Sequence, residues 1–409
     1  MVKKWTGILV FLFFLQLGFA QLSGTKTVGG TTPDYATISA AVSALNSSGV
    51  NGAVTFNIRP GTYNEQFSID SVTGTSSTNT ITFQKEPNTS GEVNIQFSPT
   101  SKLYICRFLK CNYIELKSLN FKVLNTIFTS VINFRDTNSN ITIDSCSIIN
   151  TLNTNGYCLY DNFSAGSVDD LTIKNSTIKG GDIGLYLLAS GSSEAGDRLR
   201  FENNLIDSVN KTGIYLQLQD SVSIIGNTIR NFRATSDLHG LRISSCGGGI
   251  EISANKILVS AASGYGRAIA ITSSTNTTGN RGKIVNNILS IIGPTTARTI
   301  ETSSCSYMDI EFNTCYADGN STCHPINMAN NTNAFIRNNI FYAAGSSSLA
   351  YAFYVNNAAG LSSITLDYNC YYSNSSNLAY NGSNRATLTA WKTATSQVAN
   401  GINVNPQFV

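Results

Sequence analysis

The sequence has few charged residues. Only 12% of its 409 residues are Asp, Glu, Lys or Arg, about half of the usual fraction of roughly 25%. Its 27 basic and 24 acidic residues nearly balance, and no run of Lys or Arg follows the N-terminus, which excludes a general nucleic-acid-binding surface. The polarity comes instead mainly from Asn, Ser, Thr and Gly. This favours a fold in which short polar side chains stack in register.

Long apolar runs are missing beyond the N-terminus. Lys3 and Lys4 precede a short apolar stretch, and Gly18-Phe19-Ala20 has the small-x-small pattern of a signal peptidase site. The stretch is short for a membrane span, and no Cys follows the site to carry a lipid. We expect residues 1–20 to be a signal peptide, and the mature protein to be secreted or held at the cell surface without a membrane span.

The nine cysteines follow no recognisable framework. Their spacing matches neither a zinc site nor a disulfide scaffold, and an odd number leaves at least one thiol unpaired within the chain. Most of them are expected to pack in the interior, where free Cys is common. One or two disulfide bonds stay open, with Cys305–Cys323 as the favoured pair.

A short pattern recurs along most of the chain: apolar, x, apolar, x, x, Asn or small, x, apolar. Its sixth position is occupied in turn by Leu119, Cys146, Ser176, Asn204, Asn227, Asn255, Asn287, Asn313, Asn339 and Asn369. These nine intervals span 250 residues, a mean period of about 28, which is typical of a solenoid. The alternation before each Asn predicts a strand. The prediction is an all-β, single-stranded right-handed parallel β-helix solenoid with an Asn ladder.

The repeated Asn has a structural explanation. Asn tolerates the left-handed backbone conformation that a sharp corner requires. Its amide has both a donor and an acceptor, so it can bond to the coils above and below it. We therefore assign these residues to the fold and not to a ligand site.

A second set of strands lies between the Asn positions. It reads GLYLL from Gly184, GIYLQL from Gly213, GLRIS from Gly240, RAIAIT from Arg267 and ARTIET from Ala297. Glycine at the start of the first three allows a tight bend.

Both ends of the solenoid need protection, because exposed sheet edges promote aggregation. Thr32-Pro33-Asp34 is typical of a helix start, and Gly49 of a helix end. Ile38, Ala41, Val42 and Leu45 would give this N-terminal capping helix one apolar face. Near the other end, a short helix is expected from Leu388 to Val398, with Trp391 as a packing lid, followed by a closing strand from Ile402. The expected division is 1–20 signal peptide, 21–52 lead and capping helix, 53–385 coils and 386–409 closing segment.

Candidate catalytic groups are scattered. Acids at outward strand positions alternate with bases in the same columns, which indicates exposed ion pairs of small energy; the acids are Asp144, Glu202, Glu251, Asp309, Glu311 and Asp367. A lyase would use a base such as Arg, but Arg242, Arg267 and Arg298 differ in strand parity and are not expected to share a face. Neither His239 nor His324 has a nearby nucleophile with an orienting acid, and His239 is interpreted as a turn residue.

Carbohydrate binding needs no catalytic groups, only suitable aromatic and polar side chains on one face. Tyr186 and Tyr215 occupy equivalent outward positions on adjacent coils, Arg242 follows on the next, and Gln217 lies two residues after Tyr215. Aromatic faces beside polar groups could stack on and hydrogen-bond a glycan. The alternative is that these tyrosines only stack on each other.

Four segments carry a family resemblance: PDYATISAAVSALN from Pro33, RPGTYNEQFSI from Arg59, STNTITFQ from Ser77 and LTAWKTATSQVANGINVNPQF from Leu388. They resemble the opening and closing parts of exported bacterial β-helix proteins of the pectin-lyase-like type, including surface proteins. The catalytic motifs of pectinesterases and the paired-Asp motifs of polygalacturonases are not found, since Asp169-Asp170 lacks their Gly-rich setting. The resemblance leaves open whether the chain is a short member or part of a longer protein.

The favoured function is an exported, non-catalytic β-helix module for cell-surface adhesion or glycan binding. The alternatives are a polysaccharide lyase or glycoside hydrolase acting on acidic, pectin-like polysaccharide, and a structural spacer. No metal or cofactor is expected, except Ca²⁺ in the case of a lyase. The expected partner is a polysaccharide or cell-surface glycan, and the expected state is a monomer.

Overall fold

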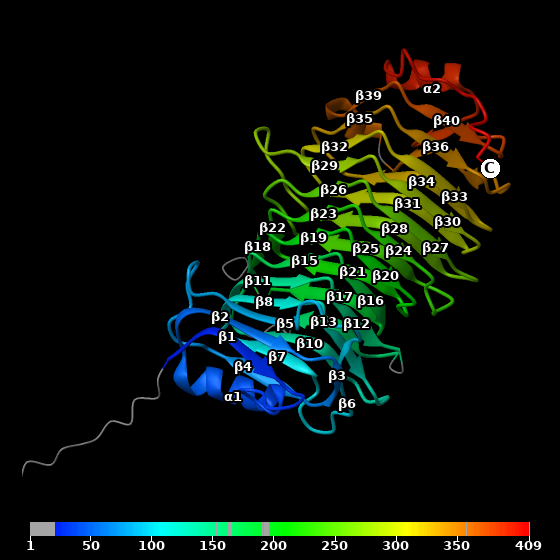
Figure 1. The fold of residues 1–409 in the computed structure, drawn as a ribbon. Helices are drawn as coiled ribbons and strands as arrows, with labels where there is room; N and C mark the ends of the chain where they lie inside the picture. Colours follow the sequence, from blue (N-terminus) through cyan, green and yellow to red (C-terminus); the bar gives the residue numbers. More distant parts are fainter. Residues whose placement is uncertain are drawn as a thin grey trace, which may run out of the picture.

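The computed structural model describes residues 21–151, 154–161, 166–189, 191, 196–356 and 358–408. The expected signal peptide lies outside these residues. The described chain winds into coils, and each coil adds one strand in turn to three long parallel sheets, named A, B and C (Figure 1). The predicted all-β parallel β-helix is confirmed.

The three sheets take up their strands in chain order as the solenoid grows. Sheet A contains β1 (Leu22–Val28), β2 (Val50–Ile58), β5 (Ile81–Lys85), β8 (Asn112–Lys117), β11 (Asn138–Asp144), β14 (Val168–Asp169), β15 (Thr172–Lys174), β19 (Arg200–Glu202), β23 (Ser223–Ile225), β26 (Glu251–Ser253), β29 (Gly282–Val285), β32 (Met308–Glu311), β35 (Phe335–Arg337) and β39 (Thr365–Asp367). Sheet B contains β3 (Gly61–Asn64), β6 (Val93–Phe97), β9 (Asn120–Val123), β12 (Ser147–Asn150), β16 (Thr177–Gly180), β20 (Leu205–Asp207), β24 (Thr228–Arg230), β27 (Lys256–Ser260), β30 (Ile288–Ile292), β33 (Thr314–Asp318), β36 (Ile340–Ala343) and β40 (Cys370–Ser373). Sheet C contains β4 (Phe67–Asp70), β7 (Cys106–Leu109), β10 (Ser130–Arg135), β13 (Tyr157–Asp161), β17 (Ile183–Leu188), β21 (Thr212–Gln217), β25 (Leu238–Ser244), β28 (Tyr265–Thr272), β31 (Thr296–Ser303), β34 (Thr322–Ala329), β37 (Leu349–Ala350), β38 (Phe353–Val355), β41 (Ala379–Asn381) and β42 (Asn384–Arg385). Outside these sheets lie the pair β18 (Gly196–Asp197) and β22 (Gln219–Asp220), the helices α1 (Ile38–Ser48) and α2 (Leu388–Thr395), and the 3₁₀ helix η2 (Ala358–Ser363).

The corner between sheets A and B consists of two residues. The left-handed backbone conformation was predicted at the ladder residue, the sixth position of the repeat, and this prediction is wrong by one position. The left-handed residue is the one before each ladder residue, and the ladder residue itself follows it with its side chain inside. Positive φ angles occur at Ser118, Ser145, Asn175, Asn203, Gly226, Ala254, Asn286, Phe312, Asn338 and Tyr368. Asn is therefore not selected at the ladder for its backbone preference.

The Asn ladder is held by its amides, as Asn287 illustrates. Its Nδ2 donates to the carbonyl of Ile252 at 2.9 Å and to Oδ1 of Asn313 at 2.9 Å. Its Oδ1 accepts from the backbone N–H of Asn255 at 3.0 Å. Each buried amide thus satisfies backbone groups that the corner takes out of the sheet ladders, which confirms the structural role of these residues.

The cysteines are interior packing residues. All nine are buried and unpaired, and burial raises the pKa of the Cys315 thiol to about 12. The predicted Cys305–Cys323 disulfide is wrong. Cys305 follows the end of β31, whereas Cys323 lies near the start of β34, so the two residues are at opposite ends of parallel neighbouring strands.

The N-terminal cap is confirmed, with a later start than expected. Thr37 is the N-cap, and its hydroxyl accepts from the N–H of Ala40 at 3.0 Å. Asp34 instead holds the preceding loop, because its carboxylate accepts from the N–H of Thr27 at 2.7 Å. The predicted apolar face is buried and Gly49 ends the helix. In Figure 1, α1 lies across the end of the solenoid.

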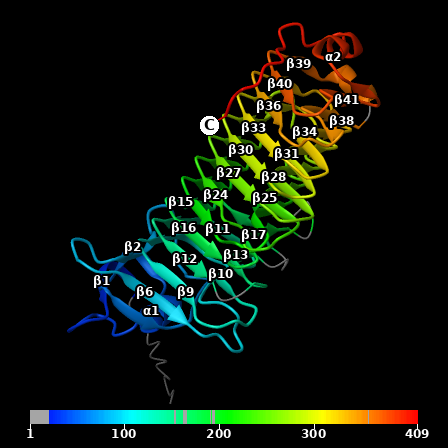
Figure 2. The ribbon, with the colours of Figure 1, turned by 90° about the vertical axis from the view of Figure 1, so that its right-hand side faces the viewer.

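The C-terminal end is closed by α2 and a tail. Trp391 is fully buried, and its ring centroid lies 5.4 Å from that of Phe353, which confirms it as a packing lid. The predicted closing strand is wrong, because only Ile402 bridges to sheet B, through Cys370. The tail then runs back beside sheet B (Figure 2), where Phe408 contacts Tyr316.

Candidate functional site

The outer face of sheet C carries one continuous column of side chains in register. Its members, from β13 to β41, are Tyr160, Tyr186, Tyr215, Arg242, Ala270, Glu301, Asn327, Tyr354 and Tyr380. Three of the four residues predicted to bind a ligand, Tyr186, Tyr215 and Arg242, are consecutive members of this column.

The sheet C strands bend just before this column. Gly240 and Leu241 are both buried and face the interior. The residues on either side of this pair, His239 and Arg242, therefore both lie on the outer face. A Cβ on Gly240 would lie 2.4 Å from Cγ2 of Ile257 and 2.5 Å from the carbonyl oxygen of Ala268. Glycine is therefore required at this position by the close approach of neighbouring coils, whereas the pair of inward residues recurs without glycine at Ala268 and Ile269.

The bend creates a second outward column beside the first. It aligns His239, Arg267, Arg298 and His324 on successive coils. The prediction that Arg242, Arg267 and Arg298 do not share a face is wrong, because strict alternation fails where two successive residues point inward. His239 lies inside β25 and is not a turn residue.

At one end of this surface is a tyrosine cluster formed by Tyr157, Tyr160, Tyr186 and Tyr215. The rings of Tyr157 and Tyr160 are stacked with centroids 4.4 Å apart, and those of Tyr157 and Tyr186 are 4.8 Å apart. Tyr215 meets Tyr186 edge-on at 5.2 Å. Phe128, which is 41% exposed, packs edge-on against Tyr157. The rings that stack are therefore those of Tyr157 with Tyr160 and Tyr186. Tyr186 and Tyr215, the pair expected to stack, contact each other edge-on, and the cluster presents half-buried aromatic surface.

An arginine cluster continues the surface where the tyrosine cluster ends. The guanidinium of Arg242 lies 4.5 Å from the ring centroid of Tyr215. On the following coils Arg267 and Arg298 both pair with Glu301, and Arg267 Nη1 is 3.4 Å from Nε2 of His239. All of these groups except Arg298 border a hollow of about 360 Å³.

The arginine cluster is cationic at neutral pH. Burial lowers the pKa of His239 to about 4, and the positive charges of Arg267 and Arg242 act in the same direction, against Glu301. The imidazole is therefore neutral at pH 7. Three guanidinium groups and one carboxylate leave two positive charges, which favours anionic ligands.

We predict that stability falls as the pH drops from about 6.5 towards 4. Burial also lowers the pKa of His324, to about 3. Between pH 6.5 and 4 both histidines take up protons in the unfolded chain but not in the folded one, so the free energy of unfolding decreases by at most about 1.4 kcal/mol per pH unit for each. Urea unfolding at pH 7, 6 and 5 measures this. The double variant His239→Gln/His324→Gln should show a flatter slope, and an unchanged slope would contradict the assignment.

Gln217 is the predicted residue that the structure leaves apart. It pairs with Leu188 and Ser244 in the sheet and lies two residues beyond Tyr215, but it is not among the residues that border the hollow. The residues that sequence reasoning missed are Glu301 and the two histidines. The sequence feature that could have identified them is the pair of successive inward residues at each bend. This pair shifts the inward–outward alternation of the strand by one residue.

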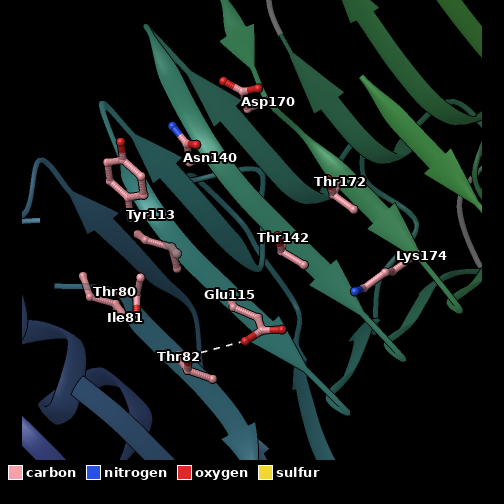
Figure 3. Close-up of a pocket in the computed structure, with 11 residues that line it drawn as sticks. Thr80, Ile81, Thr82, Tyr113, Glu115, Asn140, Thr142, Asp170, Thr172 and Lys174 are labelled. Carbon is pink, nitrogen blue, oxygen red and sulfur yellow. Dashed lines mark hydrogen bonds between the residues drawn. The ribbon is translucent and has the colours of Figure 1, made fainter. Parts of the chain in front are cut away.

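The outer face of sheet A carries some of the predicted ion pairs, since Lys174 lies 3.6 Å from Asp144 and Arg337 lies 2.6 Å from Glu311. Glu251, Lys283 and Asp309 are in register on successive coils, but Asp309 pairs with Arg281 at 2.7 Å instead of with Lys283. Figure 3 shows a shallow pocket on this face, in which Glu115 contacts Thr82 and Asp170 lies on the far side. Asp170 is engaged by two hydrogen bonds from Arg198, at 2.6 and 2.8 Å. This face is therefore a solvated charge ladder.

Within the described ranges, no three or more His, Cys, Asp and Glu side chains gather in a way that could hold a metal ion. In the same residues, no helix has both the length and the apolar character needed to cross a membrane.

No protein-family model and no curated protein match the sequence. Among solved structures, the A-module of a mannuronan C-5 epimerase from Azotobacter vinelandii is 12% identical, with a TM-score of 0.52 over 90% of this chain and 96% of that one. This likeness shows the fold, a parallel β-helix. Two further similar structures are a lacto-N-biosidase from Eubacterium ramulus, 10% identical with a TM-score of 0.46 over 79% and 64% of the two chains, and a pectin methylesterase from Aspergillus niger, 12% identical with a TM-score of 0.30 over 95% and 93%.

Proposed function

We propose that the outer face of sheet C binds an acidic polysaccharide that lies along the helix axis, as a non-catalytic module. The observation that carries this proposal is the contact between Tyr215 and Arg242, which joins the tyrosine cluster to the arginine cluster on one face. Aromatic rings offer flat surfaces for sugar rings. The adjacent guanidinium groups offer planar donors for carboxylates.

The spacing of the coils supports a long ligand. Strands in a sheet are about 4.8 Å apart, so the column presents a side chain at regular steps of that size. The two positive charges at the arginine cluster favour a uronate polymer over a neutral one. Because the column crosses many coils, a polymer gains contacts that a single sugar does not.

We predict that Tyr215→Ala weakens binding of polygalacturonate or alginate about tenfold. The substitution removes both the ring surface and the ring beneath the Arg242 guanidinium, a loss of about 1.4 kcal/mol. Arg242→Gln should weaken binding similarly and reduce its dependence on salt, because exposed charges are screened. Affinity electrophoresis and isothermal titration calorimetry at low and high NaCl concentration measure both effects.

The matched control is Tyr342→Ala. Tyr342 belongs to an aromatic column on the outer face of sheet B, where its ring centroid lies 5.3 Å from that of Tyr316. This variant should bind as the unchanged protein does. Equal losses of polysaccharide affinity in Tyr215→Ala and Tyr342→Ala would contradict a binding site on sheet C. Failure of the unchanged protein to bind uronate or neutral polysaccharides would instead favour a structural spacer.

A polysaccharide lyase acting on the same chain is the second candidate. It is favoured by the neutral His239 imidazole beside Arg267 in a hollow bordered by Arg242. In such a reaction a base removes the proton next to the uronate carboxylate, the bond to the leaving oxygen breaks and a C=C bond forms. Incubation with uronate polymers, with and without Ca²⁺, tests this. No rise in absorbance from unsaturated products would leave the non-catalytic module.

We further propose that the protein is exported and acts outside the cell, in surface adhesion. The N-terminal segment with Lys3, Lys4 and Gly18-Phe19-Ala20 supports this. N-terminal sequencing of the exported protein should find Gln21 first. Retention of Met1 in the mature protein would exclude the signal peptide.

A further inference from the structure

A separate hollow lies on the outer face of sheet A, towards the N-terminal coils (Figure 3). Its volume of about 480 Å³ is within the range of about 300–1,000 Å³ for ligand pockets. The residues that border it come from β5, β8, β11 and β15 and from the corners before these strands. None of them belongs to the columns of sheet C, so the hollow is independent of the proposed polysaccharide surface.

Two parallel rows of side chains form this hollow. The first row consists of outward residues at the same position of successive strands: Thr82, Glu115, Thr142 and Thr172. The second row lies two residues earlier in each strand or corner: Tyr113, Asn140 and Asp170 (Figure 3). The short threonines lie between the longer side chains of Tyr113 and Lys174, and this difference in length leaves the hollow.

Glu115 brings an unpaired negative charge to the hollow. Its carboxylate accepts from a threonine hydroxyl at 3.5 Å and forms no ion pair with any Lys or Arg that the structure describes. The other charged groups at the border are engaged, since Asp170 accepts two hydrogen bonds from Arg198 and Lys174 lies 3.6 Å from Asp144. A ligand that enters the hollow therefore meets a carboxylate without a counter-ion, which favours a cation.

The rest of the lining matches the surface of a sugar. The threonine hydroxyls and the Asn140 amide both donate and accept hydrogen bonds, as sugar hydroxyls do. The ring of Tyr113 contacts no other aromatic ring in the described ranges, so no aromatic neighbour covers its face. Tyr113 and Glu115 are two residues apart on one strand, a distance of about 7 Å, which a single sugar ring bridges. A lysine side chain would use only the carboxylate, whereas a sugar with an ammonium group uses all three kinds of partner.

We propose that this hollow binds an amino sugar with a free ammonium group, as one residue of a glucosamine polymer. The ammonium pairs with the Glu115 carboxylate, the sugar ring lies against Tyr113, and the sugar hydroxyls bond to the row of threonines. Because a charge-assisted hydrogen bond is stronger than a neutral one, the ammonium sets the affinity. The site goes beyond the proposed function and does not depend on it, since the two faces differ in residues and in the sign of the ligand charge.

Glucosamine oligomers with free amines test the proposal on the full mature chain. Isothermal titration calorimetry at pH 6 should detect their binding, and N-acetylated oligomers of the same length should bind about tenfold more weakly, as for loss of a hydrogen bond to a charged group. The chain as a whole has no excess of acidic residues, so its overall charge does not attract a cation. Equal affinity for both oligomers, or binding of neither, would overturn the proposal. Equal affinity for oligolysine would show that the ammonium alone is bound and would overturn the assignment to a sugar.

Glu115→Gln tests the charge, because it keeps the shape of the side chain. It should lower the affinity for glucosamine oligomers about tenfold and remove most of its dependence on NaCl concentration. The matched control is Glu251→Gln, which removes an outward carboxylate of the same face beyond the hollow, in register with Lys283. This control should bind as the unchanged protein does. Equal losses in the two variants would overturn the site.

Tyr113→Asn tests the ring and keeps the backbone. Asn140 occupies the same corner position on the next coil with φ of 54°, close to the 59° of Tyr113. This variant should weaken binding of glucosamine oligomers about fivefold through loss of the ring face, and an unchanged affinity would overturn the placement of the sugar. Tyr215→Ala should leave this binding unchanged while it weakens binding of uronate polymers. A loss confined to one class of polymer therefore separates failure of one site from failure of the other.

Discussion

Replacing Asn287 by alanine should lower the free energy of unfolding by about 4 kcal/mol, because two buried backbone groups lose their partners at about 1–3 kcal/mol each. These groups are the N–H of Asn255 and the carbonyl of Ile252. The substitution also interrupts the amide chain to Asn313. Urea unfolding followed by circular dichroism measures the loss.

The ladder itself contains the matched comparison. At Ser176 the hydroxyl accepts from the N–H of Cys146 at 3.0 Å and donates to the carbonyl of Lys174 at 2.8 Å. Asn287→Ser should therefore lose less stability than Asn287→Ala. Asn64→Ala, at an exposed strand position where the side chain accepts from Gln96, should cost under about 1 kcal/mol. Equal losses at Asn287 and Asn64 would show that the ladder contributes nothing special.

Replacing Trp391 by alanine should cost about 3–5 kcal/mol, the range for removing a large buried aromatic side chain. Trp391 is fully buried and closes the last coil against Phe353. Because each coil of a solenoid contacts only its neighbours, the loss should be local. Hydrogen exchange should become faster in β38 to β41 and stay slow in the central coils.

Trp391→Phe is the control for this prediction. The indole Nε1 makes no hydrogen bond of normal geometry within the described residues, although a side-chain contact with Trp391 lowers the pKa of the Tyr371 hydroxyl against the larger effect of burial. Phenylalanine therefore keeps most of the packing and gives up only this weak polar contact. This variant should lose much less stability than Trp391→Ala. Faster exchange throughout the solenoid in Trp391→Ala would contradict a local cap and indicate that the coils unfold together.

The architecture was predictable because one physical pattern repeats. Alternating apolar positions before the corner specify a strand and a corner in each of these coils, and an inward amide wherever the ladder residue is Asn, from Asn204 to Asn369. The details that failed are those without a repeat. Thr32-Pro33-Asp34 has the composition of a helix start, but Asp34 is used by Thr27, so the helix begins only after Thr37. Such competition between local partners cannot be seen in a pattern.

The site was predictable only in part, for a geometric reason. Tyr186, Tyr215 and Arg242 could be aligned because they follow the bend at equal distances. His239, Arg267 and Arg298 precede the bend, and simple alternation assigns them to the wrong side. The ion pairs of Glu301 were not predicted for the same reason, because its partners Arg267 and Arg298 lie on the other side of the bend. The small residues Gly240 and Ala268 are the sequence signs that two residues there point inward together.

The parallel pairing of the sheets gives the proposed binding face a direction. Successive coils enter sheet C with the same backbone sense, so the face has no two-fold symmetry and its ends differ. Tyr160 and Tyr186 are at one end of the column, Arg242 and Glu301 follow, and Tyr354 comes near the other end. A polysaccharide also has two different ends. A face of this kind therefore distinguishes a chain from the same chain reversed, and the order of the coils sets which orientation binds more tightly.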